Sequence, residues 1–342
     1  MSLPGGNSNG HVGLRQLLSS AAQRPRLPQR IRDRFRPLTP ELRQTVEQAL
    51  RNHFFADRSV HPAGAEAHLA TPEGQADLES HIAGRLDVFR TWTIPWLDSL
   101  LKLEGARILE IGCGTGASTV ALEEQGAEVV GVDVSAAALA SARERCAAYE
   151  LHPEFVETNA TSIASMFAGR RFDAILFFAV VEHLTWEERI ASLQAAWKLL
   201  PPNGILAVIE APNRLWYVDI HTTDEPFYNW LPDDAAIAYT RYLASGPSRQ
   251  LFTEPAEDAK LHLARLGRGV SYHDFVIAWN IPRDRLPVAG YLAEFHGSKW
   301  GSALGRLTAG GRYRKLLSSA APDLHPAFLQ PSLDLAFRKV GS

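Results

Sequence analysis

The chain has few cysteines and no long hydrophobic segment. Its 342 residues include two cysteines, Cys113 and Cys146, so neither a disulfide framework nor a cysteine metal site is expected, and we assign no metal ligand. A reducing, cytoplasmic setting is the simplest prediction. No apolar run approaches the roughly 20 residues that a membrane-spanning helix needs, and residues 1–11 are polar rather than signal-like. These absences predict a soluble protein.

The chain also lacks a large excess of either charge. Its formal net charge is -3, which gives no overall field for capturing nucleic acid. An arginine- and proline-rich tract within residues 1–38 is the local exception, and we predict that it is a flexible arm. Clustered arginines could bind phosphate of RNA or of an anionic lipid. Prolines and single acids interrupt the tract, so a solvated linker is the simpler interpretation.

Helical patterns fill the stretch from residue 39 to residue 104. Thr39 and Pro40 have the residue types of an N-cap and a first helical position, and apolar residues then recur at helical spacing up to Phe54. A second helical stripe begins near Gln75, and Pro95 interrupts it. We expect these helices to pack on the following domain and to help close its mouth.

From residue 106 the pattern alternates between short apolar runs and helical stretches, as a doubly wound α/β sheet requires. An aromatic- and proline-rich stretch then interrupts it and predicts a cap. We predict a mostly parallel, seven-stranded sheet with helices on both faces. The expected strands are 107–111, 128–132, 154–157, 172–180, 205–210, 270–278 and 333–340, and the expected helices are 117–125, 136–150, 187–200 and 254–266.

A glycine-rich turn between the first strand and the first helix is the clearest motif. Without side chains, such glycines let backbone approach a ligand closely and adopt positive φ. Gly112, Gly114 and Ala117 formally satisfy the dinucleotide pattern G-x-G-x-x-A. Glu110 and Gly116 extend the same turn to E-x-G-x-G-x-G, so the turn alone permits more than one cofactor.

With the downstream strand ends, this string resembles the class I S-adenosylmethionine-dependent methyltransferases, and the resemblance covers roughly half of the chain. It implies a Rossmann-like fold and S-adenosylmethionine as cofactor. The further matching positions are Asp133, Asn159-Ala160, Phe172-Asp173-Ala174-Ile175, Glu182-His183-Leu184 and Leu199 to Gly204. The predicted segments are a flexible arm (1–38), a helical extension (39–104), the cofactor half of the core (105–213), a cap (214–269) and the last two core strands with an intervening insertion (270–342).

The resemblance also implies roles for single residues. Asp133 would bind the two ribose hydroxyls, and Asn159 would accept from the adenine amino group where the family more often has Asp. Glu110 would hold the loop and the amino acid end of the cofactor, and Phe178 would lie near the sulfonium. The full predicted cofactor set is Glu110, Gly112, Cys113, Gly114, Gly116, Asp133, Val134, Asn159, Ala160 and Phe178.

Methyl transfer to a hydroxyl needs a base, because the oxygen must lose its proton. His183 at the end of the fourth predicted strand and His221 in the cap are the candidates, and Asp219 could orient His221. Either histidine could instead have a purely structural role. The aromatic cap favours a small-molecule acceptor, with a hydroxyl oxygen as the methylated atom.

Three other functions remain as alternatives. Residues 179–183 lack the Asn/Asp-Pro-Pro-aromatic motif expected for methylation of base amino groups, but RNA or protein could still be methylated through the arginine-rich arm. The protein could bind S-adenosylmethionine without catalysis. A nicotinamide-dependent oxidoreductase is the third alternative. The sequence does not predict the oligomeric state.

Overall fold

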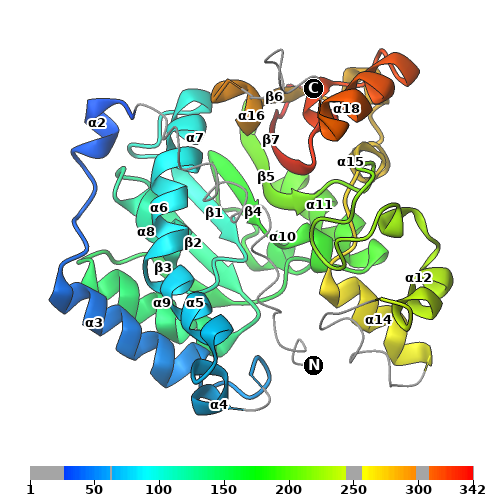
Figure 1. Ribbon diagram of the computed structural model, residues 1–342. Coiled ribbons are helices and arrows are strands. Elements are labelled where there is room, and N and C mark those ends of the chain that lie inside the picture. The colour runs from blue at the N-terminus through cyan, green and yellow to red at the C-terminus, as the bar shows by residue number, and fades with distance from the viewer. Residues whose placement is uncertain (1–26, 62–63, 244–255, 298–307, 342) are drawn as a thin grey trace.

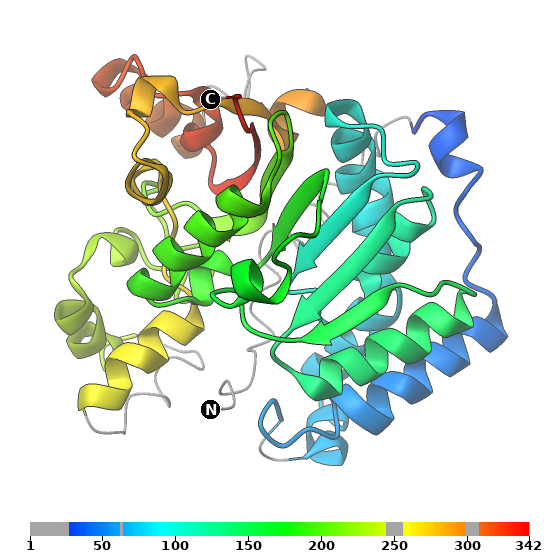
Figure 2. The same ribbon diagram turned by 180° about the vertical axis from the view of Figure 1, so that it is seen from behind.

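A seven-stranded mixed sheet forms the centre of the computed structural model, which describes residues 27–61, 64–243, 256–297 and 308–341 (Figures 1 and 2). The strand order is β3-β2-β1-β4-β5-β7-β6. The first five strands pair in parallel, and β7 runs antiparallel to both β5 and β6. The strands are β1 Arg107–Ile111, β2 Glu128–Asp133, β3 Glu154–Glu157, β4 Ala174–Phe178, β5 Ile205–Pro212, β6 Val288–Tyr291 and β7 Ser332–Arg338.

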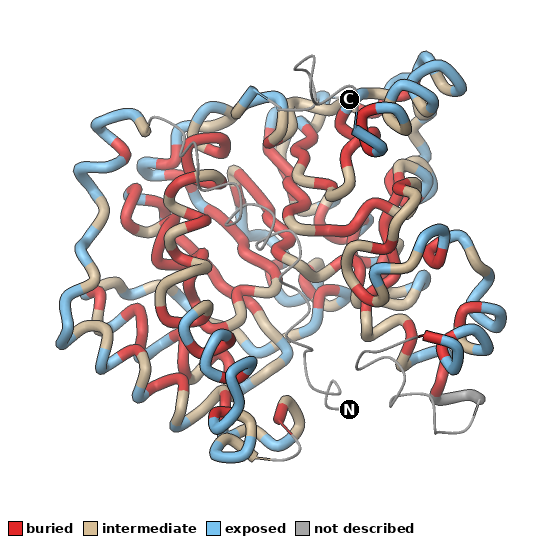
Figure 3. Tube along the Cα trace, viewed as in Figure 1, coloured by how far each residue is buried: buried red, intermediate tan, exposed pale blue. Residues whose placement is uncertain are grey.

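Two apolar cores lie on opposite faces of this sheet, because neighbouring side chains of a strand point to opposite faces. In β4, Leu176 belongs to the core under the N-terminal helices, and Phe177 belongs to the core under α11. Figure 3 shows this buried centre between exposed outer helices. The helices of the α/β core are α8 Ala117–Glu123, α9 Ala136–Ala148, α10 Ile163–Met166 and α11 Trp186–Leu199.

The predicted helix starts in the core agree with local capping chemistry. The Ser135 hydroxyl accepts from the backbone of Ala138 at the start of α9. Thr185 and Glu188 form a reciprocal capping box at the start of α11. These caps fix where each helix begins beside the carboxyl end of the preceding strand.

The N-terminal extension covers one face of the sheet (Figure 1). Thr39 caps α3 as predicted, since its hydroxyl accepts from the backbone of Leu42. Three π-helical turns interrupt the extension at Leu50–Phe54, Ser80–Gly84 and Phe89–Thr93. The α-helices of this part are α2 Gln29–Arg32, α3 Pro40–Ala49, α4 Ala65–Leu69, α5 Pro72–Glu79, α6 Arg85–Val88 and α7 Ile94–Leu100.

The end of the predicted flexible arm lies against the core. Ile31 is buried, and Arg34 donates to the Gln125 carbonyl at 2.6 Å and pairs with Glu104 at 3.0 Å. Arg36 pairs with Glu150 at 2.6 Å. Apolar burial and acidic partners therefore hold residues 27–38 in place, whereas residues 1–26 of the predicted arm lie outside the described part of the chain.

The prediction of a strand at residues 270–278 is wrong, because this segment contains helix α15, Tyr272–Trp279. Ser271 and Asp274 form a capping box there, and Phe275 and Ala278, three residues apart, are both buried. The sixth strand is β6, inside the region predicted as an insertion. The fourth strand also ends two residues earlier than predicted, since Ala179 leaves the extended region with φ +49.

Further helices follow β5 in the described parts of the chain. In the described ranges, no helix has the length and apolar composition of a membrane span. The remaining helices are α12 Asp233–Thr240, α14 Ala256–Leu266, α16 Leu292–Phe295, α18 Ala309–Ala320 and the 3-10 turns Val181–His183, Tyr228–Trp230, Arg283–Arg285 and Pro326–Leu329.

Candidate active site

The glycine turn lies at the carboxyl end of β1, and its three glycines meet different surroundings. A Cβ on Gly112 would lie 2.1 Å from Val180 Cγ2, and one on Gly116 would lie 3.0 Å from the Cα of Ala142. Gly114 has φ +50, and a Cβ there would meet no atom within 4 Å. Gly112 and Gly116 thus permit close packing within the protein, while Gly114 leaves open space in which a ligand can approach the backbone.

Asp133, at the end of β2, is fixed beside this turn. Its Oδ2 accepts from the Gly114 amide at 2.9 Å, and its Oδ1 accepts from the Ser135 amide at 2.9 Å. Burial raises the pKa of Asp133, and these backbone bonds oppose that rise. Val134 is 46% exposed although it is apolar. The pair presents carboxylate acceptors beside an open apolar surface, which fits a ribose and a flat ring.

Glu110 stabilises the turn from inside the protein. It is fully buried and accepts from the hydroxyls of Ser118 and, at 2.6 Å, Thr119 in α8. Burial raises the pKa of Glu110 to about 7. Its carboxyl group therefore joins β1 to the first turn of α8, which is the loop-holding part of its predicted role.

Cys113 is part of the turn, but its thiol faces away from the open side. The side chain is 3% exposed, and a Cβ on Gly131 of β2 would lie 3.0 Å from its sulfur. Burial raises the pKa of the thiol. Only the backbone of Cys113 is placed to contact a ligand in the turn.

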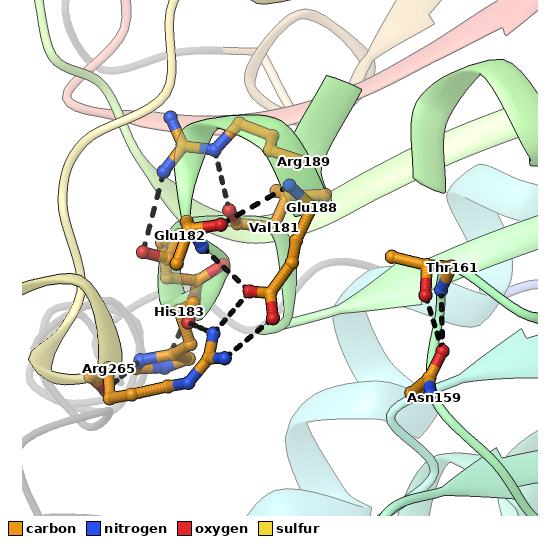
Figure 4. A network of polar contacts seen from close by, with 9 residues as sticks. Asn159, Thr161, Val181, Glu182, His183, Glu188, Arg189 and Arg265 are labelled. Atoms are coloured by element: carbon orange, nitrogen blue, oxygen red, sulfur yellow. Dashed lines mark hydrogen bonds and ion pairs between the residues drawn. The ribbon is translucent and has the colours of Figure 1, made fainter. Parts of the chain in front are cut away.

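Asn159 follows β3, and its amide oxygen is committed to the local turn (Figure 4). Oδ1 accepts from the Thr161 amide at 3.1 Å, the Thr161 hydroxyl at 2.6 Å and the Ser162 amide at 3.0 Å. The oxygen therefore already accepts three contacts within its own turn, and an adenine amino group would have to compete with them for its lone pairs. The neighbouring Ala160 is 7% exposed.

Phe178 ends β4 and contacts the N-terminal extension. Its ring meets that of Phe89 edge to face with centroids 5.3 Å apart. A second contact joins the extension to the glycine turn, since Nδ1 of His81 lies 3.1 Å from the Thr115 hydroxyl. His81 is not among the residues predicted from the sequence, because helical periodicity identifies the packed face of a helix but not the polar residue that reaches a distant loop.

His183 stands in the 3-10 turn that follows β4. Its Nδ1 lies 2.8 Å from the carbonyl oxygen of Arg265, which implies that Nδ1 carries the proton and that Nε2 keeps a lone pair. Loss of solvent and the neighbouring His221 lower the pKa of His183 to about 3. The ring is neutral near pH 7 and able to accept a proton at Nε2.

His221 lies beside His183, with ring centroids 5.2 Å apart. Burial lowers the pKa of His221 to about 4. Tertiary structure thus brings together the two histidines that the sequence predicted as candidate bases, although 38 positions separate them in the printed sequence.

Asp219 supports the His221 loop through its backbone. Its carboxylate accepts from the backbone amides of His221, Thr222 and Thr223 at 3.1, 3.2 and 3.1 Å. It also accepts from the Asn229 side chain at 3.2 Å. The predicted contact with the imidazole ring is replaced by contacts with the loop amides, so Asp219 acts on His221 through the position of the loop.

Glu182 is an additional buried acid beside this histidine pair. It is fully buried, and neither carboxyl oxygen has a hydrogen-bond partner among the described residues. Burial raises the pKa of Glu182 to about 8, and its Oε1 lies 3.8 Å from Nε2 of His183. One ligand atom each from Glu182, His183 and His221 lies within 4.8 Å of the others, so the three could share a proton or hold a cation.

Two arginines fix the backbone around His183 (Figure 4). Arg265 of α14 donates to the His183 carbonyl at 2.8 Å and pairs with both carboxylate oxygens of Glu188 at 2.6 and 2.7 Å. Arg189 donates to the Val181 carbonyl at 2.8 Å. These contacts join the end of β4, α11 and α14, which makes His183 a well-positioned side chain.

Comparison with known families finds a model described as "Methyltransferase domain" that matches residues 108–204. The ubiquinone biosynthesis O-methyltransferase of Bradyrhizobium sp. (strain ORS 278) is 31% identical over 192 residues, which cover 54% of this chain and 70% of the relative. The protein of that name from Cereibacter sphaeroides is 36% identical over 110 residues, or 32% of this chain. This chain spans 43% of the length of that relative.

Solved structures also resemble the chain. Magnesium protoporphyrin IX methyltransferase from Synechocystis PCC 6803 is 21% identical, with a TM-score of 0.36 and coverage of 49% of this chain and 77% of that one. An S-adenosylmethionine-dependent methyltransferase from Clostridium acetobutylicum is 19% identical, with a TM-score of 0.34 and coverage of 39% and 55%.

Proposed function

Because the chain belongs to the class I S-adenosylmethionine-dependent methyltransferases, we propose that it transfers a methyl group from S-adenosylmethionine to a hydroxyl oxygen of a small molecule. The geometry of His183 is the observation that supports a hydroxyl oxygen as the methyl acceptor. Its Nδ1 is held by the Arg265 carbonyl, while Nε2 stays available to receive a proton. The name of the relatives, O-methyltransferase, supports the same acceptor atom.

The bound cofactor supplies an electrophilic methyl group on a sulfonium. The backbone of Gly114 would hold it, with Asp133 as the acceptor for the ribose hydroxyls and Val134 on the adenine side. Phe178, whose ring packs on that of Phe89, would limit access of water to the sulfonium end. Holding the acceptor oxygen in line with the methyl carbon is the main contribution of the site, and such positioning reaches effective molarities on the order of 10⁵–10⁸ M.

The acceptor hydroxyl loses its proton to Nε2 of His183. The low pKa keeps this ring neutral before reaction, and the carboxyl group of Glu182, 3.8 Å away, stabilises the imidazolium once that carboxyl is ionised. A positioned base of this kind contributes roughly 10²–10⁴-fold to the rate. His221 orients the acceptor or shares its proton from the neighbouring position.

An aromatic cluster in the predicted cap supports a ring-bearing or apolar acceptor. The rings of Phe227 and Trp230 lie 4.8 Å apart, and the residues are 49% and 48% exposed. Tyr217 and Tyr313 add a neighbouring pair at 4.9 Å. Exposed aromatic pairs provide a face on which a flat or apolar molecule can pack.

A nucleic-acid substrate is less well supported by the arginine-rich arm. In its described part, Arg30, Arg34 and Arg36 pair with Asp98, Glu104 and Glu150 on the core. These guanidinium groups already have carboxylate partners, so phosphate would have to displace them. An uncharged small acceptor should bind with little salt dependence, in contrast to a polyanionic substrate.

The test is methyl transfer from isotopically labelled S-adenosylmethionine to panels of phenols, catechols and aliphatic alcohols. His183→Gln should lower kcat on the best acceptor by roughly 10²–10⁴-fold and leave cofactor affinity unchanged. His152→Gln, ahead of β3, is the matched control and should retain wild-type rates. Cofactor binding with no labelled product from any acceptor would favour a non-catalytic binding protein and contradict the proposal.

A further inference from the structure

We propose that His61, His68 and Asp77 form a second ligand site, which binds one divalent transition-metal ion, with zinc as the best fit. One ring nitrogen of each histidine and one carboxylate oxygen of Asp77 lie within 4.8 Å of one another. This zinc site belongs to the N-terminal extension and is separate from the His183 centre. It does not depend on the proposed methyl transfer.

Three different segments supply these side chains. His61 lies in the loop between the first π-helical segment and α4, His68 is on α4, and Asp77 is on α5; Figure 1 labels both helices. The two imidazole rings stack with centroids 4.5 Å apart. Nε2 of His68 lies 3.2 Å from Oδ2 of Asp77. The turn and the two short helices thus converge on one point.

The second, independent observation is an unsatisfied nitrogen. His61 is 8% exposed, and its Nε2 is buried with no hydrogen-bond partner among the residues that the structure describes. Buried polar atoms normally have a partner, so each exception needs an explanation such as an ion.

The wall around His61 is apolar. Its ring centroid lies 5.0 Å from that of Phe55 and 5.6 Å from that of Phe54. Such surroundings limit access of water and strengthen the bond between a cation and its ligands. Metal sites in proteins commonly have such a hydrophobic shell around their ligand atoms.

The donor set selects the type of metal. Imidazole nitrogen suits zinc and other late transition metals, whereas calcium and magnesium prefer oxygen ligands throughout. Two histidines and one carboxylate give three protein ligands, and the fourth tetrahedral position stays open to water. Zinc bonds of about 2.0–2.2 Å place tetrahedral ligand atoms about 3.4 Å apart, close to the 3.2 Å between Nε2 of His68 and Oδ2 of Asp77.

This zinc site is linked to the glycine turn. Oδ1 of Asp77 lies 3.7 Å from Nε2 of His81, and Nδ1 of His81 lies 3.1 Å from the Thr115 hydroxyl. A metal on Oδ2 would restrict the rotation of Asp77 and thereby the position of His81. We expect zinc to fix the extension over the cofactor turn.

The first experiment treats the full-length protein with a chelator and then titrates it with zinc in competition with a chromophoric chelator. One equivalent should bind. Free zinc at about 100 times its Kd should raise the unfolding midpoint by about 4 °C, given the usual unfolding entropy per residue. Cobalt should give the visible absorption of a four- or five-coordinate site with nitrogen ligands.

Variants then locate the metal. His68→Gln and His61→Asn should each weaken zinc binding at least 10-fold and abolish the zinc-dependent rise in midpoint. His53→Gln is the matched control, because His53 is in the same extension and its Nε2 pairs with Glu144 at 2.7 Å. That variant should bind zinc like the wild type.

Spectroscopy of the histidine rings in the wild-type protein tests the same ligands without relying on variants that could fail to fold. In the wild-type protein, nitrogen-15 NMR should show coordination shifts for two histidine rings per zinc. No saturable binding, or zinc binding that persists in His68→Gln and is lost in His221→Gln, would overturn the proposal. The latter result would place the ion at Glu182, His183 and His221.

Discussion

Oε1 of Glu182 lies 3.8 Å from Nε2 of His183, and the carboxyl group is fully buried. Burial raises the pKa of Glu182 to about 8. The acid is therefore neutral near pH 7 and becomes charged as the pH rises through about 8. This pair gives the candidate base a neighbour whose charge depends on pH.

Replacement of Glu182 should change the pH dependence of methyl transfer. In the wild type, ionisation above pH 8 favours the imidazolium form of His183, so kcat should rise there beyond the rise due to the acceptor itself. Glu182→Gln cannot ionise. The ratio of wild-type to variant kcat, measured on one acceptor, should increase from pH 7 to pH 9, and a constant ratio would contradict the role of Glu182.

Alanine variants of Gly114 and Gly116 should distinguish a glycine that admits the cofactor from a glycine that permits packing within the protein. Positive φ costs a non-glycine residue roughly 1–2 kcal/mol, and both Gly114 and Gly116 have positive φ. Gly114→Ala should show this loss of unfolding free energy and a large loss of cofactor affinity, because its methyl group would occupy the open space. Gly116→Ala should be destabilised further by contact with Ala142. Calorimetric binding and chemical denaturation of both variants measure the two effects, and wild-type affinity in Gly114→Ala would refute the assignment.

Asp133 and Asp173 form a matched pair of strand-end acids. Asp133 accepts from Gly114 in the turn, whereas Asp173 accepts from the Arg107 amide at 2.9 Å at the opposite end of β1. Hydrogen bonds to charged groups contribute about 1.5–3 kcal/mol, so Asp133→Ala should weaken S-adenosylmethionine binding roughly 10–150-fold. Asp173→Ala should retain the wild-type affinity. Equal affinities of the two variants would exclude Asp133 as the ribose acceptor.

The buried His221 should make the protein sensitive to acid. Its pKa is about 4 in the folded state, against about 6.5 for an unperturbed histidine, so the unfolded chain binds the proton more tightly. The stabilisation is complete above pH 6.5 and is lost as the pH falls toward 4, with a slope of up to about 1.4 kcal/mol per pH unit. His221→Gln should lack this contribution. Urea denaturation across this pH range tests it, and parallel stability curves would contradict it.

Much of the cofactor half could be predicted from the sequence. Glu110, Gly114 and Asp133 lie in short motifs at strand ends, and adjacent parallel strands bring those ends to one edge of the sheet. Helix starts such as Thr39 and Ser135 depend on side chains within three residues of the bonds that they make. Local chemistry and strand order are sufficient for these features.

Other site features depend on neighbours that sequence spacing does not identify. Asn159 has the expected position, but its oxygen is taken by Thr161 and Ser162. Similarly, the apolar alternation at residues 270–278 fitted a strand, whereas the capping box of Ser271 and Asp274 and packing on the sheet favoured a helix. Over so few residues, an apolar pattern does not by its periodicity alone distinguish a strand from a short helix.

The sequence by itself determined the family, the cofactor turn and the positions of the first five strands and the last one, because these follow from local motifs and hydrophobic periodicity. Only the tertiary structure decided which nitrogen of His183 is free, what surrounds Glu182, and that His61, His68 and Asp77 converge. Those properties arise from contacts between segments distant in the chain. Desolvation and hydrogen-bond geometry, which set the chemistry of each group, exist only after folding has brought those segments together.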